Sequence, residues 1–492
     1  MPCPTCSRRR PQRHRRKVLH PDRHRSLQQK AAFPTSSLVT IFKALWLLGL
    51  LLYSLAGASL VPFHPDEGEH IRMSRDFVTA FIDRQPQTLA VRIESTTGRP
   101  ATPEETLRLI NAPLHGYVMG LAWNLRGLTV DQLPPLWNWG ADYATNLAEG
   151  RRPSEAMLSA ARGASAVFLW LSSVLVFALG KRSGGEVAAF IASGLYITNP
   201  LVLFHARRAM HEAPLLAFGC LTLWVASVIA AKRVRSSTIS PLWWLALTLC
   251  AGLTLAAKHT GVVFIAAAFV WIFLVEVLSR PAISIPSLLY SMGRLTLIGV
   301  GALLIFLLLS PAYWRDPVGR LGDTLRLRTR TIVAQVAGTP GAPIPFEQRV
   351  NWLITQPLMR PLDSAHDVQE GQHYGASGWS GFHWGLWGII PTAFALVGLI
   401  SAVHHVANSR RRRARAAQSL GLMIWLVAVS ALALANPLPW QRYFAPVIPV
   451  VMLLAASGMV QGLSILSPMF NHRAKWQPLK PGLNDQRLKK LQ

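Results

Sequence analysis

Long apolar blocks with few charged residues recur along this 492-residue chain. Blocks of about 18 or more apolar residues are typical of transmembrane helices, because a helix of that length crosses the hydrocarbon core of a bilayer. The pattern predicts ten spans, at 38–60, 160–180, 187–204, 210–231, 241–257, 259–278, 291–312, 385–405, 418–435 and 443–466. We therefore predict an all-α polytopic membrane protein with one transmembrane module at 38–466.

Two long polar segments, 61–159 and 313–384, interrupt this series of spans. They contain 18 of the 23 acidic residues of the chain. If both termini lie in the cytoplasm, both segments face the extracytoplasmic side of the membrane. We expect the functional site among these large acid-rich loops.

The net charge of +27 comes from basic clusters in the tails and in short connections, at 8–17, 181–182, 232–235, 410–413 and 473–490. Short loops rich in Lys and Arg are typical of the cytoplasmic face. The clusters therefore predict disordered basic cytoplasmic tails at 1–37 and 467–492, with membrane lipids as partners and no nucleic acid.

Residues 112–126 are apolar but number only about fifteen, which is short for a span. If this segment crossed the membrane, the basic clusters at 181–182, 232–235 and 410–413 would lie opposite the N-terminal tail. We therefore predict a juxtamembrane or re-entrant helix there, which keeps every basic cluster on one side.

The run HPDEGEH at 64–70 follows the first apolar span directly. It is either a solvated turn with Pro65 and Gly68 or a cluster that carries chemistry. A partly desolvated carboxylate at Asp66 or Glu67 would have a raised pKa and could act as a general base near neutral pH.

His64, Glu67 and His70 recur at a spacing of three, which would place them along one face of a helix. Such a face is a conceivable site for a divalent metal ion. Pro65 and Gly68 oppose a regular helix, however, so the sequence establishes no metal or other cofactor.

Two further groups of charges lie at span ends that the topology places outside. Arg207 and Arg208 could bind an anionic ligand such as a phosphate, or one of them could pair with Glu212. Lys258 could complete a phosphate site or extend to the lipid headgroups.

Arg442 and Tyr443 precede the last span and could anchor the interface or contact an anion. The segment 373–384 interleaves aromatic residues with Gly and Ser. Such residues suit stacking on sugars but equally an interfacial aromatic belt, which we favour.

In this order the motifs resemble the GT-C superfamily of membrane glycosyltransferases, in the branch of protein O-mannosyltransferases and the lipid A aminoarabinose transferase. The similar motifs are Asp66-Glu67, Asn111-Ala112-Pro113-Leu114, Arg207 with Glu212, the stretch 251–261 that ends near Lys258, and Arg442-Tyr443 with Pro446 and Pro449. The resemblance covers about residues 38–465. Two positions depart from the family: Asn111-Ala112 replaces a basic residue, and Glu212 replaces an aspartate.

The resemblance implies transfer of one sugar, a hexose or pentose, from a polyprenyl-phosphate donor to a protein, glycolipid or glycan acceptor. It also implies an active site outside a bacterial plasma membrane. Together with the charges described above, the resemblance leads to the following predicted roles: Asp66 as the catalytic base with Glu67 beside it; Arg207, Arg208, Lys258 and Arg442 at the donor phosphate; and Glu212, His70, His115 and Tyr443 in support. The alternatives are a transporter or lipid flippase, for which the sequence shows no internal repeat, and a scaffold without catalysis.

Overall fold

A computed structural model describes residues 35–94, 96–235, 238–279, 284–362, 368–408 and 413–471. Among these residues the regular elements are helices, and one isolated β-bridge joins Ile93 and Pro100. Contacts between Cα atoms divide the chain into two compact units, Met1–Leu48 and Gly49–Gln492. The predicted tails lie mainly outside the described residues.

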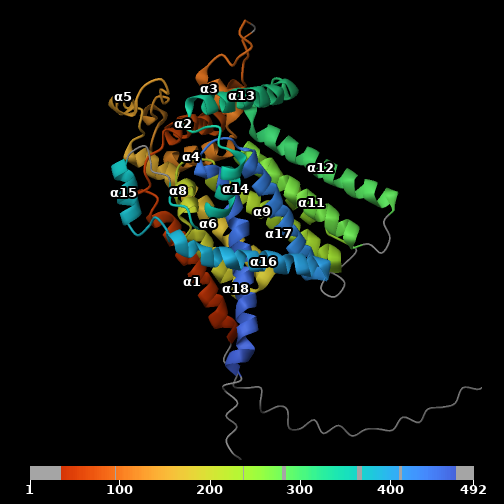
Figure 1. Cartoon of the computed structure of the whole chain (residues 1–492). Helices are drawn as coiled ribbons and strands as arrows, with labels where there is room; N and C mark the ends of the chain where they lie inside the picture. The colour runs from red at the N-terminus through yellow and green to blue at the C-terminus, as the bar shows by residue number, and fades with distance from the viewer. Residues whose placement is uncertain are drawn as a thin grey trace, which may run out of the picture. The chain divides into compact units, whose positions relative to one another are not determined.

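The helices, labelled as in Figure 1, are α1 (Thr35–Ala56), α2 (Pro65–Met73), η1 (Val78–Ile82), η2 (Pro86–Leu89), α3 (Pro103–Ile110), α4 (Leu114–Asn124), η3 (Val130–Gln132), α5 (Tyr143–Ala148), α6 (Glu155–Gly184), α7 (Glu186–Ile197), α8 (Pro200–Ala206), α9 (Glu212–Arg235), α10 (Pro241–Ala257), η4 (His259–Gly261), α11 (Val262–Leu278), α12 (Ile285–Leu309), η5 (Pro311–Tyr313), α13 (Pro317–Gly338), α14 (Phe346–Thr355), α15 (Val368–Ala376), η6 (Gly385–Gly388), α16 (Ile389–Ala407), α17 (Arg413–Ala435), η7 (Gln441–Val447) and α18 (Ile448–Asn471).

The prediction of a polytopic membrane protein is confirmed: the chain is an integral multi-pass membrane protein. Eight of the described helices are long and apolar enough to span a bilayer, or nine if the bent pair α7–α8 forms one span. The remaining predicted span corresponds to α10, an apolar helix of 17 residues. Each of the ten predicted apolar blocks therefore contains a helix, although the count of spans by length is lower.

Helix α9 is the most buried of these spans and packs against α6, α10, α11 and α17. Its sequence is apolar on all sides, as expected for a helix surrounded by other helices. Gly219 lets α9 approach α11 closely, because a Cβ atom there would lie 2.7 Å from the ring of Phe264. Small residues serve the same purpose at other helix contacts in membranes.

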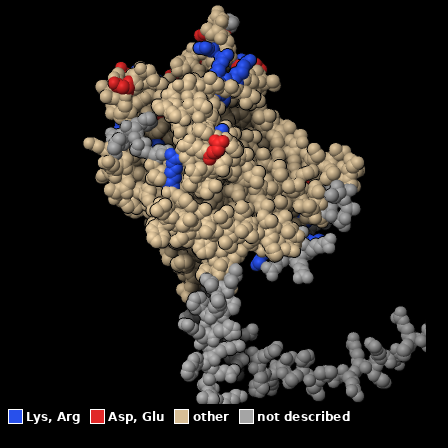
Figure 2. Space-filling model, viewed as in Figure 1, with Lys and Arg blue, Asp and Glu red and all other residues tan. Residues whose placement is uncertain are grey.

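The two acid-rich loops contact one another. Helix α13 of the second loop packs against α3 of the first and against η5. The hydroxyl of Tyr313 donates to the Leu109 carbonyl at 3.2 Å and lies 2.9 Å from the Thr324 hydroxyl. On the face shown in Figure 2, charged side chains gather over the loops and are sparse along the apolar helices. The loops predicted to share one face therefore lie together.

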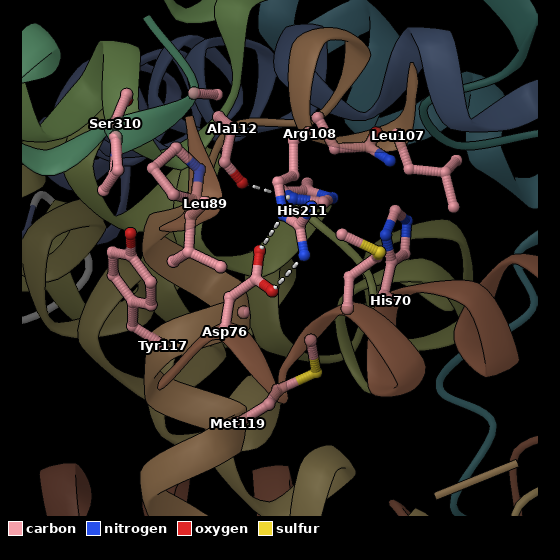
Figure 3. Close-up of a pocket in the computed structure, with 16 residues that line it drawn as sticks. His70, Asp76, Leu89, Leu107, Arg108, Ala112, Tyr117, Met119, His211 and Ser310 are labelled. Atoms are coloured by element: carbon pink, nitrogen blue, oxygen red, sulfur yellow. Dashed lines mark hydrogen bonds and ion pairs between the residues drawn. The ribbon is translucent and has the colours of Figure 1, made fainter. Parts of the chain in front are cut away.

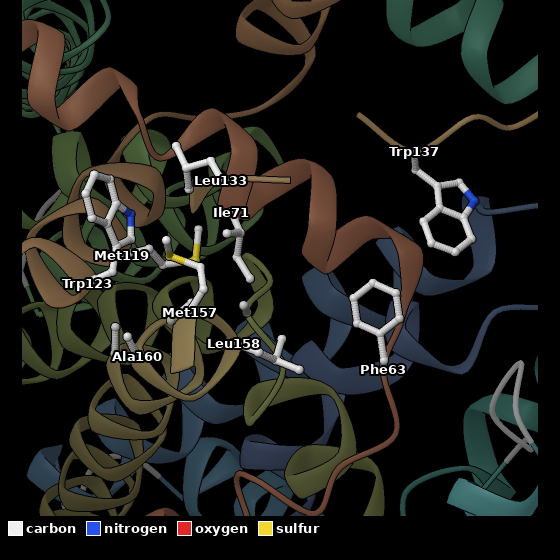
Figure 4. Close-up of a cluster of buried hydrophobic side chains, with 12 residues drawn as sticks. Phe63, Ile71, Met119, Trp123, Leu133, Trp137, Met157, Leu158 and Ala160 are labelled. Carbon is white, nitrogen blue, oxygen red and sulfur yellow. The ribbon is translucent and has the colours of Figure 1, made fainter. Parts of the chain in front are cut away.

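Helix α2 is anchored by a buried apolar cluster that joins it to α4 and α6 (Figure 4). Ile71 of α2 packs in this cluster with Met119, Trp123 and Met157, all of them buried. The indole N–H of Trp123 also donates to the hydroxyl of Ser74, at 2.7 Å. These contacts fix α2, and with it the acidic run that begins the helix.

The sequence-based objection to a helix at 64–70 was wrong. Pro65 occupies the first helical position, where its missing N–H leaves no bond unmade. The side chain of His64 caps the helix by accepting a bond from the Asp66 N–H. The Glu67 carboxylate in turn accepts a bond from the His64 backbone N–H, at 3.0 Å. The predicted juxtamembrane helix within 112–126 is α4, whose 11 residues are too few to cross a bilayer.

Candidate active site

Asp66 lies in the first turn of α2, where its side chain meets a cation from the other end of the chain. Its Oδ2 atom lies 2.5 Å from Nη1 of Arg442 and 3.7 Å from Nδ1 of His64. Burial acts to raise the pKa of Asp66, but His64 and Arg442 outweigh it and hold this pKa well below the usual range. The expectation of a raised pKa was therefore wrong for this state of the protein, because the sequence did not show the Arg442 contact.

Glu67 makes a buried structural ion pair. Its two carboxylate oxygens each accept a 2.8 Å bond from the guanidinium of Arg162 on α6. They also accept bonds from the backbone N–H groups of Ala209, at 2.8 Å, and His64. Burial acts to raise the pKa of Glu67, but Arg162 holds it below the usual value. Glu67 therefore joins α2, α6 and the 207–211 connection.

Four of the predicted site residues, Glu212, Lys258, Arg442 and Tyr443, line one pocket, which we call the cation pocket. It encloses about 460 Å³ of empty space, including space open to solvent. Nζ of Lys258 donates to Glu212 at 2.7 Å. The sequence-based pairing of Glu212 with Arg207 or Arg208 was therefore wrong, since Lys258 takes that place.

The cation pocket lies where span ends meet. Glu212 begins α9, Lys258 follows the end of α10, and Arg442 lies in η7 before α18. The guanidinium of Arg442 also lies over the ring of Trp440, with 4.6 Å between its Cζ and the ring centroid. Through the contact with Arg442, Asp66 stands beside this pocket.

Exposure separates two groups among the predicted residues. The side chains of Asp66, Lys258 and Arg442 are 19%, 22% and 16% exposed, whereas Glu67 is fully buried. A ligand can therefore reach the first three without unfolding of the site, and it cannot reach Glu67.

Arg207 is fully buried, and each nitrogen of its guanidinium donates to a protein group. Its guanidinium donates to the Ser54 carbonyl at 3.1 Å, to the Tyr374 hydroxyl at 3.2 Å, and to the carbonyls of Tyr53 and Trp379. It therefore joins α8 to the end of α1 and to the second loop, and this geometry disfavours its predicted phosphate contact. Tyr374 is buried in the same contact, so the predicted aromatic belt at 373–384 is in part interior.

Arg208 differs from Arg207 in leaving a buried nitrogen without a bond. Its Nε donates to the Pro62 carbonyl at 3.1 Å, and its guanidinium lies 3.9 Å from the centroid of the Phe204 ring. Its Nη2, however, has no hydrogen-bond partner in the part of the chain that the structure describes. Both ring nitrogens of His205 are also buried and have no hydrogen-bond partner among the described residues. Unbonded buried polar atoms are uncommon, and a ligand is one way of satisfying them.

His70, His115 and His211 form a row of imidazoles. The ring centroids of His70 and His211 lie 4.3 Å apart, and those of His115 and His211 lie 5.7 Å apart. Burial lowers the pKa of all three to about 3, so the rings are neutral at pH 7. The proposed supporting residues His70 and His115 thus share one cluster, which Asp66 adjoins through His70.

The spacing-based metal site does not form. Among the described residues, no group of three or more His, Cys, Asp or Glu side chains is placed to hold a metal ion. Glu67, the middle member of the predicted set, is bound to Arg162 instead.

Residues 132–314 match the family described as dolichyl-phosphate-mannose-protein mannosyltransferase. This region contains Arg207, Arg208, Glu212 and Lys258, and it is less than half of the chain. The predicted resemblance to membrane glycosyltransferases is confirmed. Asp66 and Arg442 lie outside the match, so their roles depend on the geometry described above.

No curated protein sequence matches the chain. Among solved structures, the oligosaccharyltransferase AglB from Archaeoglobus fulgidus is 13% identical with a TM-score of 0.45, and the match covers 92% of this chain and 54% of that one. ArnT from Cupriavidus metallidurans, bound to undecaprenyl phosphate, is 15% identical with a TM-score of 0.46 and coverages of 89% and 64%. The chain thus spans about half the length of AglB. At TM-scores below 0.5, these likenesses assign no residue or role here.

Sequence reasoning missed two residues of the site. Arg162 lies inside the predicted span 160–180, and His205 follows the span 187–204. A charged residue inside an apolar span is itself a signal of function or of a buried partner. Arg162 could therefore have been found from the sequence, although its partner Glu67 could not.

Proposed function

We propose that the chain transfers a single sugar from a polyprenyl-phosphate donor to an acceptor hydroxyl on the extracytoplasmic side of the membrane. The observation that carries this proposal is the Asp66–Arg442 contact, which brings an accessible carboxylate to the edge of a pocket lined with cations. The family match at 132–314 supports the donor class, since that family is described by its use of dolichyl-phosphate mannose.

Asp66 is the general base in this proposal. It accepts the proton of the acceptor hydroxyl while the hydroxyl oxygen forms a bond to the anomeric carbon. In the free protein Arg442 makes Asp66 a weak base. A donor phosphate that bonds to Arg442 weakens the Asp66 contact and adds negative charge, and both changes raise the pKa of Asp66. Donor binding thereby activates the base.

Arg442 and Lys258 are the proposed contacts of the donor phosphate, and Arg208, which is 2% exposed, joins them once the site opens. The bond between the anomeric carbon and the phosphate oxygen breaks, and its electron pair leaves with the polyprenyl phosphate. Cations placed before the reaction stabilise this developing charge. Arg442 and Lys258 are paired with Asp66 and Glu212 in the free protein, so the phosphate exchanges with these carboxylates.

The other predicted residues take positioning roles. Glu67 holds α2 against Arg162, and Arg207 holds the second loop near the site. Glu212 orients Lys258, and Tyr443 lines the pocket beside Arg442. His205 is added as a polar contact for the donor, because its buried ring nitrogens have no bonds among the described residues.

Sidedness follows from the charge pattern. Basic clusters occupy the connections at 181–182 and 232–235, and the positive-inside rule assigns those connections to the cytoplasm. The site lies at the opposite ends of the same helices, since Glu212 begins the helix that ends at Arg235. The proposed location of the site is therefore the extracytoplasmic face of the membrane.

Mass-spectrometric profiling of intact lipids and glycans in a deletion strain tests the function. Complementation with the wild type should restore a glycoside that complementation with Asp66→Asn does not. If both genes restored the same products, Asp66 would not be the base. If isolated membranes supplied with donor formed no glycoside at all, a transporter or flippase would explain the chain better.

A further inference from the structure

A second cavity, which we call the loop pocket, lies among α2, α3, α4 and η5, apart from the cation pocket (Figure 3). It contains about 520 Å³ of empty space, including space open to solvent. Asp66, Lys258 and Arg442 do not line this pocket.

The walls of the loop pocket are mainly apolar. Apolar side chains that line it include Met73, Leu89, Leu107, Met119 and Ala312. A glycan carries hydroxyl groups around its whole surface and would leave most of them without partners against such walls. The lining therefore favours a ligand with an apolar body.

The charged groups of the loop pocket cancel one another. Arg108 donates two bonds to the carboxylate of Asp76, at 2.7 Å and 2.8 Å, as Figure 3 shows. The hydroxyl of Tyr117 is occupied by the Leu309 carbonyl at 3.0 Å. A ligand thus meets a nearly neutral surface with few free polar groups.

One polar atom in the pocket does point to a ligand. Ser310 is 2% exposed and lines the pocket, and its hydroxyl has no hydrogen-bond partner among the described residues. A hydroxyl or ether oxygen of a ligand, separate from the hydroxyl that reacts at Asp66, would satisfy it. The site therefore combines an apolar cavity with an isolated hydrogen-bonding group, a common composition for small-molecule pockets.

The loop pocket lies along the same face of α2 as Asp66. His70 and Met73, which line the pocket, are four and seven residues after Asp66, and this spacing puts them on one side of the helix. A ligand in the pocket could thus extend one turn along α2, past His70, to the Asp66 carboxylate.

We propose that the loop pocket binds the acceptor, and that this acceptor is an alcohol with an apolar body, of the terpenoid or acyl-chain type. The proposal rests on the proposed function. The hydroxyl group of the alcohol lies beyond His70, next to Asp66. Asp66 accepts its proton while its oxygen forms the bond to the anomeric carbon of the sugar. The cation pocket holds the donor phosphate, so donor and acceptor approach Asp66 from different cavities.

Thiol protection tests the occupant of the pocket. In protein with Cys3 and Cys6 changed to Ser, Ala312→Cys places a reporter in the wall. Gln87→Cys places a control reporter on the exposed surface of η2, two residues before the pocket residue Leu89. Dodecanol or farnesol at ten times its dissociation constant should slow maleimide labelling of the Ala312→Cys reporter about tenfold. Neither alcohol should slow the Gln87→Cys control, and maltotriose should protect neither reporter.

Filling the pocket gives an independent test. Gly116 lines the pocket, and a Cβ atom there would lie 3.9 Å from its nearest neighbour, the Cα atom of Ser74, so the backbone admits a side chain at this position. Gly116→Leu adds three further carbon atoms at the pocket wall. It should abolish protection by the alcohols and lower transfer, with donor binding unchanged. Gly293→Leu is the matched control, because open space surrounds Gly293.

The outcomes separate the two proposals. Protection by maltotriose without protection by the alcohols would overturn the acceptor assignment, as would a Gly116→Leu variant that keeps wild-type protection and transfer. A wild type that is protected by dodecanol but forms no glycoside would instead contradict the proposed function alone. Stronger protection by farnesol than by dodecanol would indicate a terpenoid acceptor, and the reverse would indicate an acyl-chain acceptor.

Discussion

Asp66 and Arg442 lie in contact, with 2.5 Å between Oδ2 and Nη1, although 376 residues separate them in the sequence. The contact joins the first loop to the segment that precedes the last span. It also means that the proposed base and a proposed phosphate ligand neutralise one another before a donor arrives. Displacement of this pair by a phosphate would couple donor binding to activation of the base.

Replacement of Arg442 should weaken donor binding. A hydrogen bond to a charged group contributes about 1.5–3 kcal/mol, so Arg442→Ala should lower the affinity for polyprenyl phosphate about tenfold or more. Equilibrium binding to purified protein measures this. Arg442→Lys should recover only part of the affinity, because an ammonium makes a point contact and not a planar fork.

Arg207→Ala should behave differently, because that guanidinium is bonded to protein groups alone. We expect a lower melting temperature and unchanged donor affinity in the fraction that remains folded. Thermal unfolding and donor binding, measured on one preparation, separate the two effects. A loss of affinity as large as that of Arg442→Ala, with normal stability, would return Arg207 to the phosphate site.

Arg162→Ala should destabilise the fold strongly. Removal of one partner from a buried ion pair leaves an uncompensated charge, at a cost of about 3–5 kcal/mol. Lys181→Ala is the control, since Lys181 pairs with Glu186 at 2.8 Å while 53% and 42% of the two side chains are exposed. Exposed pairs contribute about 0–1 kcal/mol, so the control should unfold nearly as the wild type does. Equal melting temperatures for both variants would contradict the structural role of the Glu67–Arg162 pair.

Glu69 should make stability depend on pH. Burial and the nearby Asp66 raise the pKa of Glu69 from 4.5 to about 7. The folded state therefore holds this proton more tightly than the unfolded state does, and stability should fall as the pH rises from about 4.5 to 7. Glu69→Gln should remove that part of the fall, whereas Glu347→Gln on the exposed surface should not. Melting curves across this range that are parallel for wild type and Glu69→Gln would contradict the prediction.

The helices could be predicted from the sequence, whereas most contacts between side chains could not. Apolar blocks mark the helices, and charges at their ends mark Asp66, Glu212, Lys258 and Arg442, because ionisable groups beside a bilayer are costly without a partner or a task. Their partners were not readable, since pairs such as Lys258–Glu212 depend on how separate helices pack. The direction of the Asp66 pKa shift was missed for this reason.

Arg207 shows the same limit more sharply. Its sequence context is nearly identical to that of Arg208. Each guanidinium nitrogen of Arg207 nevertheless donates to a protein group, whereas Nη2 of Arg208 has no bond among the described residues. Adjacent residues at a helix end point in different directions. Only the packing of the end of α1 and of the second loop decides which of the two can meet a ligand.

The most direct test of the account is the Asp66→Asn variant, with transfer and donor binding measured on the same purified protein. A positioned general base contributes about 10²–10⁴-fold, so transfer should fall by that factor. Donor affinity should stay the same or rise, since Arg442 loses its carboxylate competitor. Asp131→Asn, on the exposed surface of the first loop, should leave both quantities unchanged. Retention of more than about a tenth of the transfer rate by Asp66→Asn would contradict the assignment of Asp66 as the base.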